Sequence, residues 1–161
     1  MRPKAVVTDY GDTLTDPHAD SDLRRGQRPV APDAVVALRA LHDLELRLVL
    51  ASNNRQDQPR RLALREAGVE DLFAAVVLSD EIGIGKPHAK FYRRVITACD
   101  VPAGQALWVG NNLDHDVTGP LKMGFGRAVL IGAPPPGIVL PPHSLSIEHI
   151  AELPGLIRRW K

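Results

Sequence analysis

The sequence predicts a three-layer α/β fold, in which helices cover both faces of a mostly parallel central sheet. Apolar runs of strand length alternate with helical patterns along the 161 residues, and this is the order that βα units produce. Polar residues follow three of these runs directly, namely Asp9, Ser52 and Asn111. Because the carboxyl ends of parallel strands meet at one edge of a sheet, we expect these side chains to lie together.

The first half of the chain predicts two strands and two helices. The run at 5–8 is apolar up to Thr8, as expected of a strand buried on both faces, and it ends at Asp9. A helix is predicted at 32–44, where apolar residues form one broad face and Pro32 suits the first turn. A second apolar run predicts a strand at 47–51, and a helical pattern at 59–67 stops at Gly68.

The second half continues the alternation with three strands and three helices. Apolar runs predict strands at 74–78, 106–109 and 128–131, and an amphipathic pattern predicts a helix at 89–99. A helix at 117–123 stops at Gly124, and the last helix is expected at 146–159. The prolines between residues 134 and 142 predict a stiff surface connection to that last helix.

Composition and charge exclude several classes of function. A formal net charge of +1 provides no general attraction to nucleic acid or to an anionic membrane. No apolar run approaches the ~20 residues that span a bilayer, and the amino terminus lacks an apolar signal core. The single cysteine, Cys99, cannot form an intramolecular disulfide, which fits a reducing compartment. We therefore expect a single cytoplasmic domain over residues 1–161 with neither a nucleic-acid nor a membrane partner.

Four short motifs follow one another along the chain. They are D-Y-G-D-T-L at residues 9–14, Ser52-Asn53 at a strand end, Lys86 in a G-K-P sequence, and G-N-N-L-D-H-D at residues 110–116. This order resembles the haloacid dehalogenase superfamily of aspartate-nucleophile hydrolases, most of which are phosphatases. The resemblance extends from Val6 to Ile131 and implies a Rossmann-like fold with its site at the carboxyl edge of the sheet.

The resemblance also implies roles for individual residues. Asp9 would be the nucleophile that forms an aspartyl phosphate, and Ser52 and Lys86 would complete the catalytic set. The residues implied in substrate binding are Thr13, Ser52, Asn53 and Lys86. Those implied in binding Mg²⁺ are Asp9, the Gly11 carbonyl, Asn111 and, through water, Asp116. Each has a structural alternative, such as a turn-forming Ser52, a surface Lys86 or an Asp116 that caps a helix.

Two positions depart from the family pattern. Gly11 stands where the family has the acid that protonates the leaving group, and Asn111 stands where it has an anionic metal ligand. Asp12 is expected to point elsewhere, and Asp114 would compensate only if its loop departed from the family geometry. The sequence therefore predicts a phosphatase on a small phosphorylated metabolite that favours leaving groups needing no proton. The alternatives are a catalytically reduced protein that binds a phosphorylated ligand or a protein partner, and a carbon–halogen hydrolase.

Residues 16–31 are too few to form the lid domain that many family members insert after their first motif. The segment is polar and rich in turn-forming residues, so it predicts one flexible flap loop in place of a cap. An open site would then have to be covered by a second copy of the chain or by a large substrate. Arg24, Arg25 and Arg28 of the flap could contact an anionic substrate, or form a solvated basic loop.

Overall fold

The computed structural model describes residues 1–160 and contains one six-stranded sheet, in the order β3-β2-β1-β4-β5-β6. All pairings between neighbouring strands are parallel. The strands are β1 (Ala5–Thr8), β2 (Arg47–Ser52), β3 (Phe73–Leu78), β4 (Ala106–Gly110), β5 (Arg127–Ile131) and β6 (Ser144–Ile147). The predicted α/β class with a parallel sheet is confirmed, and the five predicted strands agree with β1 to β5 to within one residue at each end.

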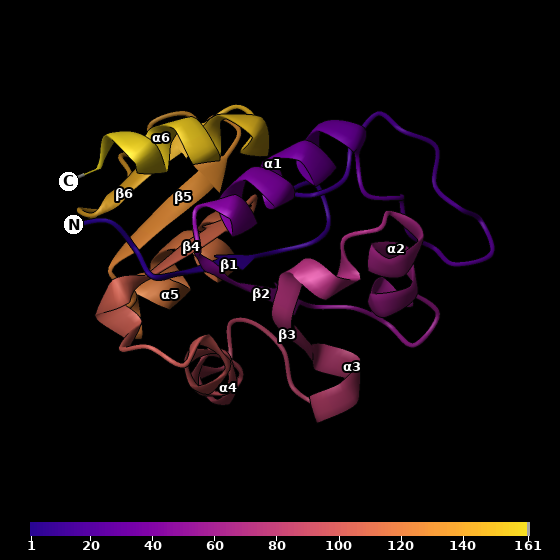
Figure 1. Cartoon of the computed structure of the whole chain (residues 1–161). Coiled ribbons are helices and arrows are strands. Elements are labelled where there is room, and N and C mark those ends of the chain that lie inside the picture. The colour runs from indigo at the N-terminus through magenta and orange to yellow at the C-terminus, as the bar shows by residue number, and fades with distance from the viewer. Residues whose placement is uncertain (161) are drawn as a thin grey trace.

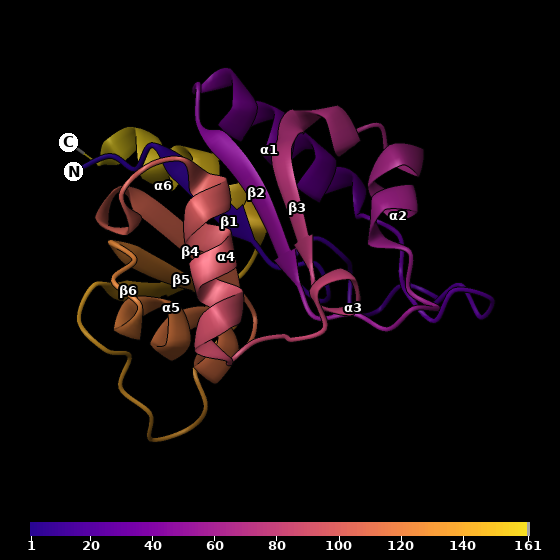
Figure 2. The same ribbon diagram turned by 90° about the horizontal axis from the view of Figure 1, so that it is seen from below.

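Helices cover both faces of the sheet, as Figures 1 and 2 show. The helices are α1 (Pro32–Asp43), α2 (Arg60–Glu66), α3 (Ser79–Ile82), α4 (Ala89–Cys99), α5 (Gly119–Lys122) and α6 (Leu153–Arg159). Helices α1 and α6 lie together on one face, whereas α4 and α5 lie on the other (Figure 1). None of the helices among the described residues has the length and apolar character needed to cross a membrane.

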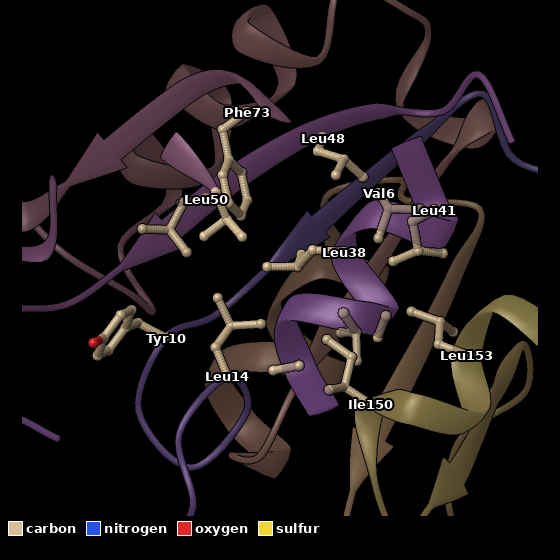
Figure 3. Close-up of a cluster of buried hydrophobic side chains, with 14 of the residues drawn as sticks. Val6, Tyr10, Leu14, Leu38, Leu41, Leu48, Leu50, Phe73, Ile150 and Leu153 are labelled. Carbon is tan, nitrogen blue, oxygen red and sulfur yellow. The ribbon is translucent and has the colours of Figure 1, made fainter. Parts of the chain in front are cut away.

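The core consists of layers on the two faces of the sheet. On the α1 face, Val6, Leu48 and Leu50 of the strands pack against Leu38 and Leu41 (Figure 3). On the α4 face, the alternate strand residues contact the inner side of α4 and the fully buried ring of Trp108. Because the central strands are buried on both faces, they read as continuous apolar runs in the sequence.

The carboxyl-terminal part of the chain differs from the prediction. The helix predicted at 146–159 begins late, because Ser144–Ile147 forms the edge strand β6 and a short 3-10 helix, Ile150–Glu152, precedes α6. The proline-rich segment therefore leads to a strand and not to the last helix. The helix predicted at 117–123 is likewise divided into a wide helical turn, Leu113–Thr118, and α5.

The segment between β1 and α1 contains turns and one isolated antiparallel bridge between Asp22 and Gln27. It is tied to α2 and to the loop before it. Arg25 pairs with Glu66 at 2.6 Å, and the Gln58 amide donates to the Gly26 carbonyl at 2.7 Å. The flap predicted to be flexible is thus anchored at its far end, and between β1 and α1 the structure contains only turns and this one bridge.

Candidate active site

The carboxyl ends of β1, β2 and β4 lie next to one another because β1 pairs with β2 on one side and with β4 on the other. The direction of the strand order changes at β1, and open α/β sheets bind ligands at such a point. Asp9 follows β1, Ser52 ends β2 and Asn111 follows β4. The sheet topology therefore places these three positions at the same edge, as the sequence predicts.

Lys86 joins the carboxylates of Asp9 and Asp116. Its Nζ lies 3.1 Å from Asp9 Oδ1 and 2.8 Å from Asp116 Oδ1. The side chains of Lys86 and Asp116 are 2% and 0% exposed, whereas that of Asp9 is 14% exposed. Asp9 is consequently the carboxylate of this group that a substrate can reach.

The Asp116 carboxylate accepts hydrogen bonds from three donors. Lys86 and the indole Nε1 of Trp108 both donate to Oδ1, the latter at 3.0 Å, and the Asn112 backbone donates to Oδ2 at 3.1 Å. Gly110 makes room for the carboxylate, because a β-carbon at that position would lie 2.2 Å from Asp116 Cγ. The contacts of Asp116 thus place it as the partner that fixes Lys86, and its role toward a metal stays a prediction.

Asn53 holds the backbone of Lys86 in place through two hydrogen bonds. Its amide nitrogen donates to the Lys86 carbonyl at 2.9 Å, and its amide oxygen accepts from the Lys86 backbone at 2.8 Å. A β-carbon at Gly85 would lie 2.5 Å from the same amide oxygen, so the close approach requires glycine. Through these contacts the end of β2 fixes the loop that precedes α4.

The charges of the group affect one another. Burial raises the pKa of Asp9 above its ordinary value, and the Lys86 ammonium opposes that rise. Burial acts to lower the pKa of Lys86, but the Asp9 and Asp116 carboxylates outweigh it and leave that pKa raised. Lys86 is therefore a cation at neutral pH, and it reduces the repulsion between Asp9 and an approaching anion.

Asn111 lies against the other oxygen of Asp9. One end of its side-chain amide is 3.2 Å from Asp9 Oδ2 and 3.1 Å from the Gly11 carbonyl oxygen. With the amide nitrogen at that end, Asn111 donates to both oxygens. With the amide oxygen there, Asn111, Asp9 and the Gly11 carbonyl would offer three neighbouring oxygen atoms, the ligand type that Mg²⁺ takes. The residues fit Mg²⁺ with one anionic ligand and two neutral ones.

Gly11 leaves the position of the family acid open. A β-carbon at Gly11 would have no atom within 4 Å. The next residue, Asp12, has a left-handed φ of 55°, and its carboxylate lies 4.0 Å from the Arg28 guanidinium. Over residues 1–160, no hydrogen bond or ion pair connects Asp12 with Asp9. The nearest charged partner of the Asp12 carboxylate is Arg28, and whether Asp12 takes part in the reaction stays a prediction.

The two hydroxyl groups predicted to bind the substrate differ in their partners. Ser52 is fully buried, and its Oγ donates to the Asn53 carbonyl at 3.1 Å. Thr13 is also buried, but its Oγ1 has no hydrogen-bond partner. A buried hydroxyl without a partner costs free energy, so the free Oγ1 of Thr13 is suited to a ligand atom.

Two residues of the site were missed by reasoning from the sequence. Trp108 was assigned to a buried strand, although a buried indole N–H needs an acceptor and so signals a nearby polar group. Arg60 is 7% exposed, and its Nε lies 3.3 Å from Ser52 Oγ. It is followed by Arg61, whose guanidinium bonds Glu81 at the surface, and no sequence signal separates these two arginines.

A family model of haloacid dehalogenase-like hydrolases matches residues 3–124. The phosphoserine phosphatase of Thermus thermophilus is 35% identical over 114 residues, which are 70% of this chain and 45% of that protein. The glyceraldehyde 3-phosphate phosphatase of Pyrococcus abyssi is 33% identical over 58% of this chain and 39% of its own length. The chain thus spans less than half the length of these curated relatives.

The fold is also similar to that of solved structures. The structure of L-2-haloacid dehalogenase from Xanthobacter autotrophicus superposes with a TM-score of 0.77 at 18% identity, covering 99% of this chain and 100% of that one. At this identity the similarity concerns the fold alone. The six-stranded parallel sheet and its helices thus have the same overall arrangement as in that dehalogenase structure.

Proposed function

We propose that this chain is a Mg²⁺-dependent phosphatase that uses Asp9 as its nucleophile. The proposal starts from the family, because the chain belongs to the haloacid dehalogenase-like hydrolases. The relatives include a phosphoserine phosphatase and a glyceraldehyde 3-phosphate phosphatase, both of which are named for small phosphorylated metabolites. We propose the same class of substrate for this chain, and we place the reaction at the carboxyl edge of β1, β2 and β4.

The observation that carries the proposal is the position of the Asp9 carboxylate. Its Oδ1 lies 3.1 Å from the Lys86 ammonium, and its Oδ2 faces Asn111 and the Gly11 carbonyl. A carboxylate that is held at both oxygens yet partly exposed is oriented for attack on phosphorus. In this scheme Oδ1 attacks, while Lys86 neutralises charge on the phosphoryl oxygens.

The remaining residues would hold the phosphoryl group. Ser52 and the free hydroxyl of Thr13 would donate to its oxygens, and a bound Mg²⁺ would supply further positive charge through Asp9, Gly11 and Asn111. A cavity of about 510 Å³ extends beside Lys86, and Asn53, Asn54 and Ser79 contribute to its lining. Such a polar cavity suits the polar remainder of a small metabolite.

Gly11 limits the choice of leaving group. Asp116, the carboxylate that shares Lys86 with Asp9, is fully buried and already accepts from Lys86 and Trp108, so it is not placed to protonate a departing alkoxide. Positioned proton transfer is worth about 10²–10⁴ in rate. A carboxylate or an aryl oxide departs without a proton. We therefore propose acyl and aryl phosphates as the better substrates and alkyl phosphates as the poorer ones.

Release of phosphate from acetyl phosphate, p-nitrophenyl phosphate and an alkyl phosphate, each with Mg²⁺, tests the proposal. We expect turnover to decrease in that order of substrate class, and we expect Asp9→Asn to abolish it while the circular dichroism spectrum stays unchanged. Activity that persists in Asp9→Asn would exclude the mechanism. Equal rates on alkyl and acyl phosphates would show that another residue supplies the proton.

The neutral residues at positions 11 and 111 favour a second candidate function, in which the chain binds a phosphorylated ligand without hydrolysing it. The same assay separates the two candidates when it is paired with calorimetry. Tight binding of inorganic phosphate with no turnover of any substrate class would support the binding function. Turnover that depends on Asp9 would support the phosphatase.

A further inference from the structure

Arg60, the first residue of α2, is a buried cation without a carboxylate partner. It is 7% exposed, and across residues 1–160 its guanidinium takes part in no ion pair. Lys86, the other buried cation of the site, contacts two carboxylates. A buried charge that no carboxylate contacts directly costs free energy, and the Asp9 carboxylate offsets that cost only from a distance, so the position of Arg60 requires an explanation.

The contacts of Arg60 connect the nucleophile turn, the end of β2 and the flap. Its Nε donates to Ser52 Oγ at 3.3 Å, and its two terminal nitrogens donate to Gln27 Oε1 at 2.9 Å and to the Asn53 carbonyl at 3.5 Å. Its Cζ lies 4.3 Å from the centre of the Tyr10 ring. A ring face and neutral oxygens compensate a guanidinium only in part. Burial lowers the pKa of Arg60, which still leaves a guanidinium protonated at neutral pH.

The hydrogen bond from Arg60 determines what Ser52 can do. A hydroxyl group has one proton, so an oxygen that accepts from Arg60 must give its own proton to another acceptor. At present that acceptor is the Asn53 carbonyl, 3.1 Å away. An anionic oxygen bound beside Asp9 would be a stronger acceptor, and rotation of the hydroxyl would direct the proton to it.

We propose that Arg60 is a positioning residue for phosphoryl binding, which holds Ser52 as a hydrogen-bond donor and supplies a buried positive charge to the bound anion. This inference rests on the proposed function, because it requires a phosphoryl group beside Asp9. The bound dianion would in turn provide the negative charge that Arg60 lacks in the structure.

Calorimetric titration with inorganic phosphate, at a fixed Mg²⁺ concentration, tests this role. Arg60→Met keeps most of the volume against Tyr10 but removes the charge and the hydrogen bonds. We expect it to weaken phosphate binding about 10-fold to 100-fold, the effect of one lost charge-assisted hydrogen bond. Arg61→Met is the matched control, because Arg61 is the next residue of α2 and bonds Glu81 at 2.8 Å on the surface. It should leave the affinity within about twofold.

A double-mutant cycle separates positioning from a merely structural role. If Arg60 acts partly through Ser52, Arg60→Met should cost clearly less affinity in a Ser52→Ala background than in the wild type. A general loss of structure would instead give the same cost in both backgrounds, and that result would overturn the inference. Thermal unfolding of each variant gives the accompanying measure of stability.

Arg60→Lys keeps the inference testable if Arg60→Met does not fold. Lysine retains the charge but not the planar group that reaches Ser52 and Gln27 together, so we expect an affinity between those of wild type and Ser52→Ala. Wild-type affinity in Arg60→Lys, or in a folded Arg60→Met, would overturn the role of Arg60 while leaving the proposed function intact. A wild-type chain that binds no phosphate would overturn both.

Discussion

The two oxygens of Asp9 have very different surroundings. On the Oδ1 side, Lys86 and Asp116 form a buried and charged group whose partners are all in place. On the Oδ2 side, Asn111 is exposed and Gly11 has open space around it. The buried side depends on several residues at once, so a single change there disturbs the whole group. The open side can change one residue at a time without disturbing the packing, and both departures from the family pattern lie there.

Lys86→Met should produce the largest effect, because it removes the cation that contacts both Asp9 and Asp116 on the buried side. It leaves the Asp116 carboxylate buried without its cation, and removing one partner of a buried pair costs about 3–5 kcal/mol. We expect that loss in the free energy of unfolding, measured with urea at pH 7, and no measurable turnover.

The pH dependence of this variant provides its control. Without Lys86, the cation that opposes the effect of burial, the pKa of the Asp9 carboxyl should rise further above its value in the unfolded chain. The folded state then binds more protons than the unfolded state, so stability should increase as the pH falls from 8 toward 5. Stability that decreases over that range would mean that another cation replaces Lys86 beside Asp9.

Gly11→Asp should sharpen the comparison by changing the open side. The position has no neighbouring atom within 4 Å of a β-carbon, so the side chain can be added without a clash. If the missing acid limits the reaction, turnover of alkyl phosphates should rise by about 10²–10⁴, while acyl phosphates should gain less because their leaving group needs no proton. Steady-state rates on both classes measure the difference. An equal gain on both would show that proton donation is not what Gly11 lacks.

Gly110→Ala and Gly11→Ala form a matched pair, one glycine on each side of Asp9. At Gly110 the added carbon would lie 2.2 Å from Asp116 Cγ, whereas at Gly11 it would meet nothing. Overpacking of this kind costs about 1–3 kcal/mol, and we expect that loss from Gly110→Ala in urea unfolding. Gly11→Ala should stay within about 0.5 kcal/mol of wild type. Similar losses in the two variants would remove the distinction between the sides.

Much of the fold could be predicted, because the central strands are buried on both faces and their apolar runs are unbroken. The edge strand β6 was missed for the opposite reason. Its sequence, SLSI, is short and partly exposed, and it precedes the apolar residues Ile150, Leu153 and Ile157, whose spacing is helical. The strand was therefore absorbed into the predicted helix. Pairing with β5, which no local pattern encodes, is what makes it a strand.

The candidate site was predictable where residues follow strands directly, as Asp9, Ser52 and Asn111 do. The order of the parallel strands alone brings those positions together, so the prediction does not depend on side-chain contacts. Arg60 was not predictable, because its role depends on which of two adjacent arginines faces the end of β2. Nor does the sequence reveal that Gly110 is needed for Asp116, since that requirement is a distance between side chain and backbone.

Asn111→Asp should have the smallest effect, and it tests whether the open side binds a cation. Asn111 offers Mg²⁺ a neutral oxygen beside Asp9 Oδ2 and the Gly11 carbonyl, and an aspartate would offer an anionic one. Because a hard dication gains more from a carboxylate, we expect Mg²⁺ to bind on the order of tenfold more tightly, as seen by calorimetry. Without Mg²⁺ the new carboxylate repels Asp9, so the variant should melt below wild type in EDTA and recover when Mg²⁺ is added. An unchanged Mg²⁺ affinity would mean that Asn111 is not a ligand, and would leave Asp114 or Asp116 as the side chain that faces the ion.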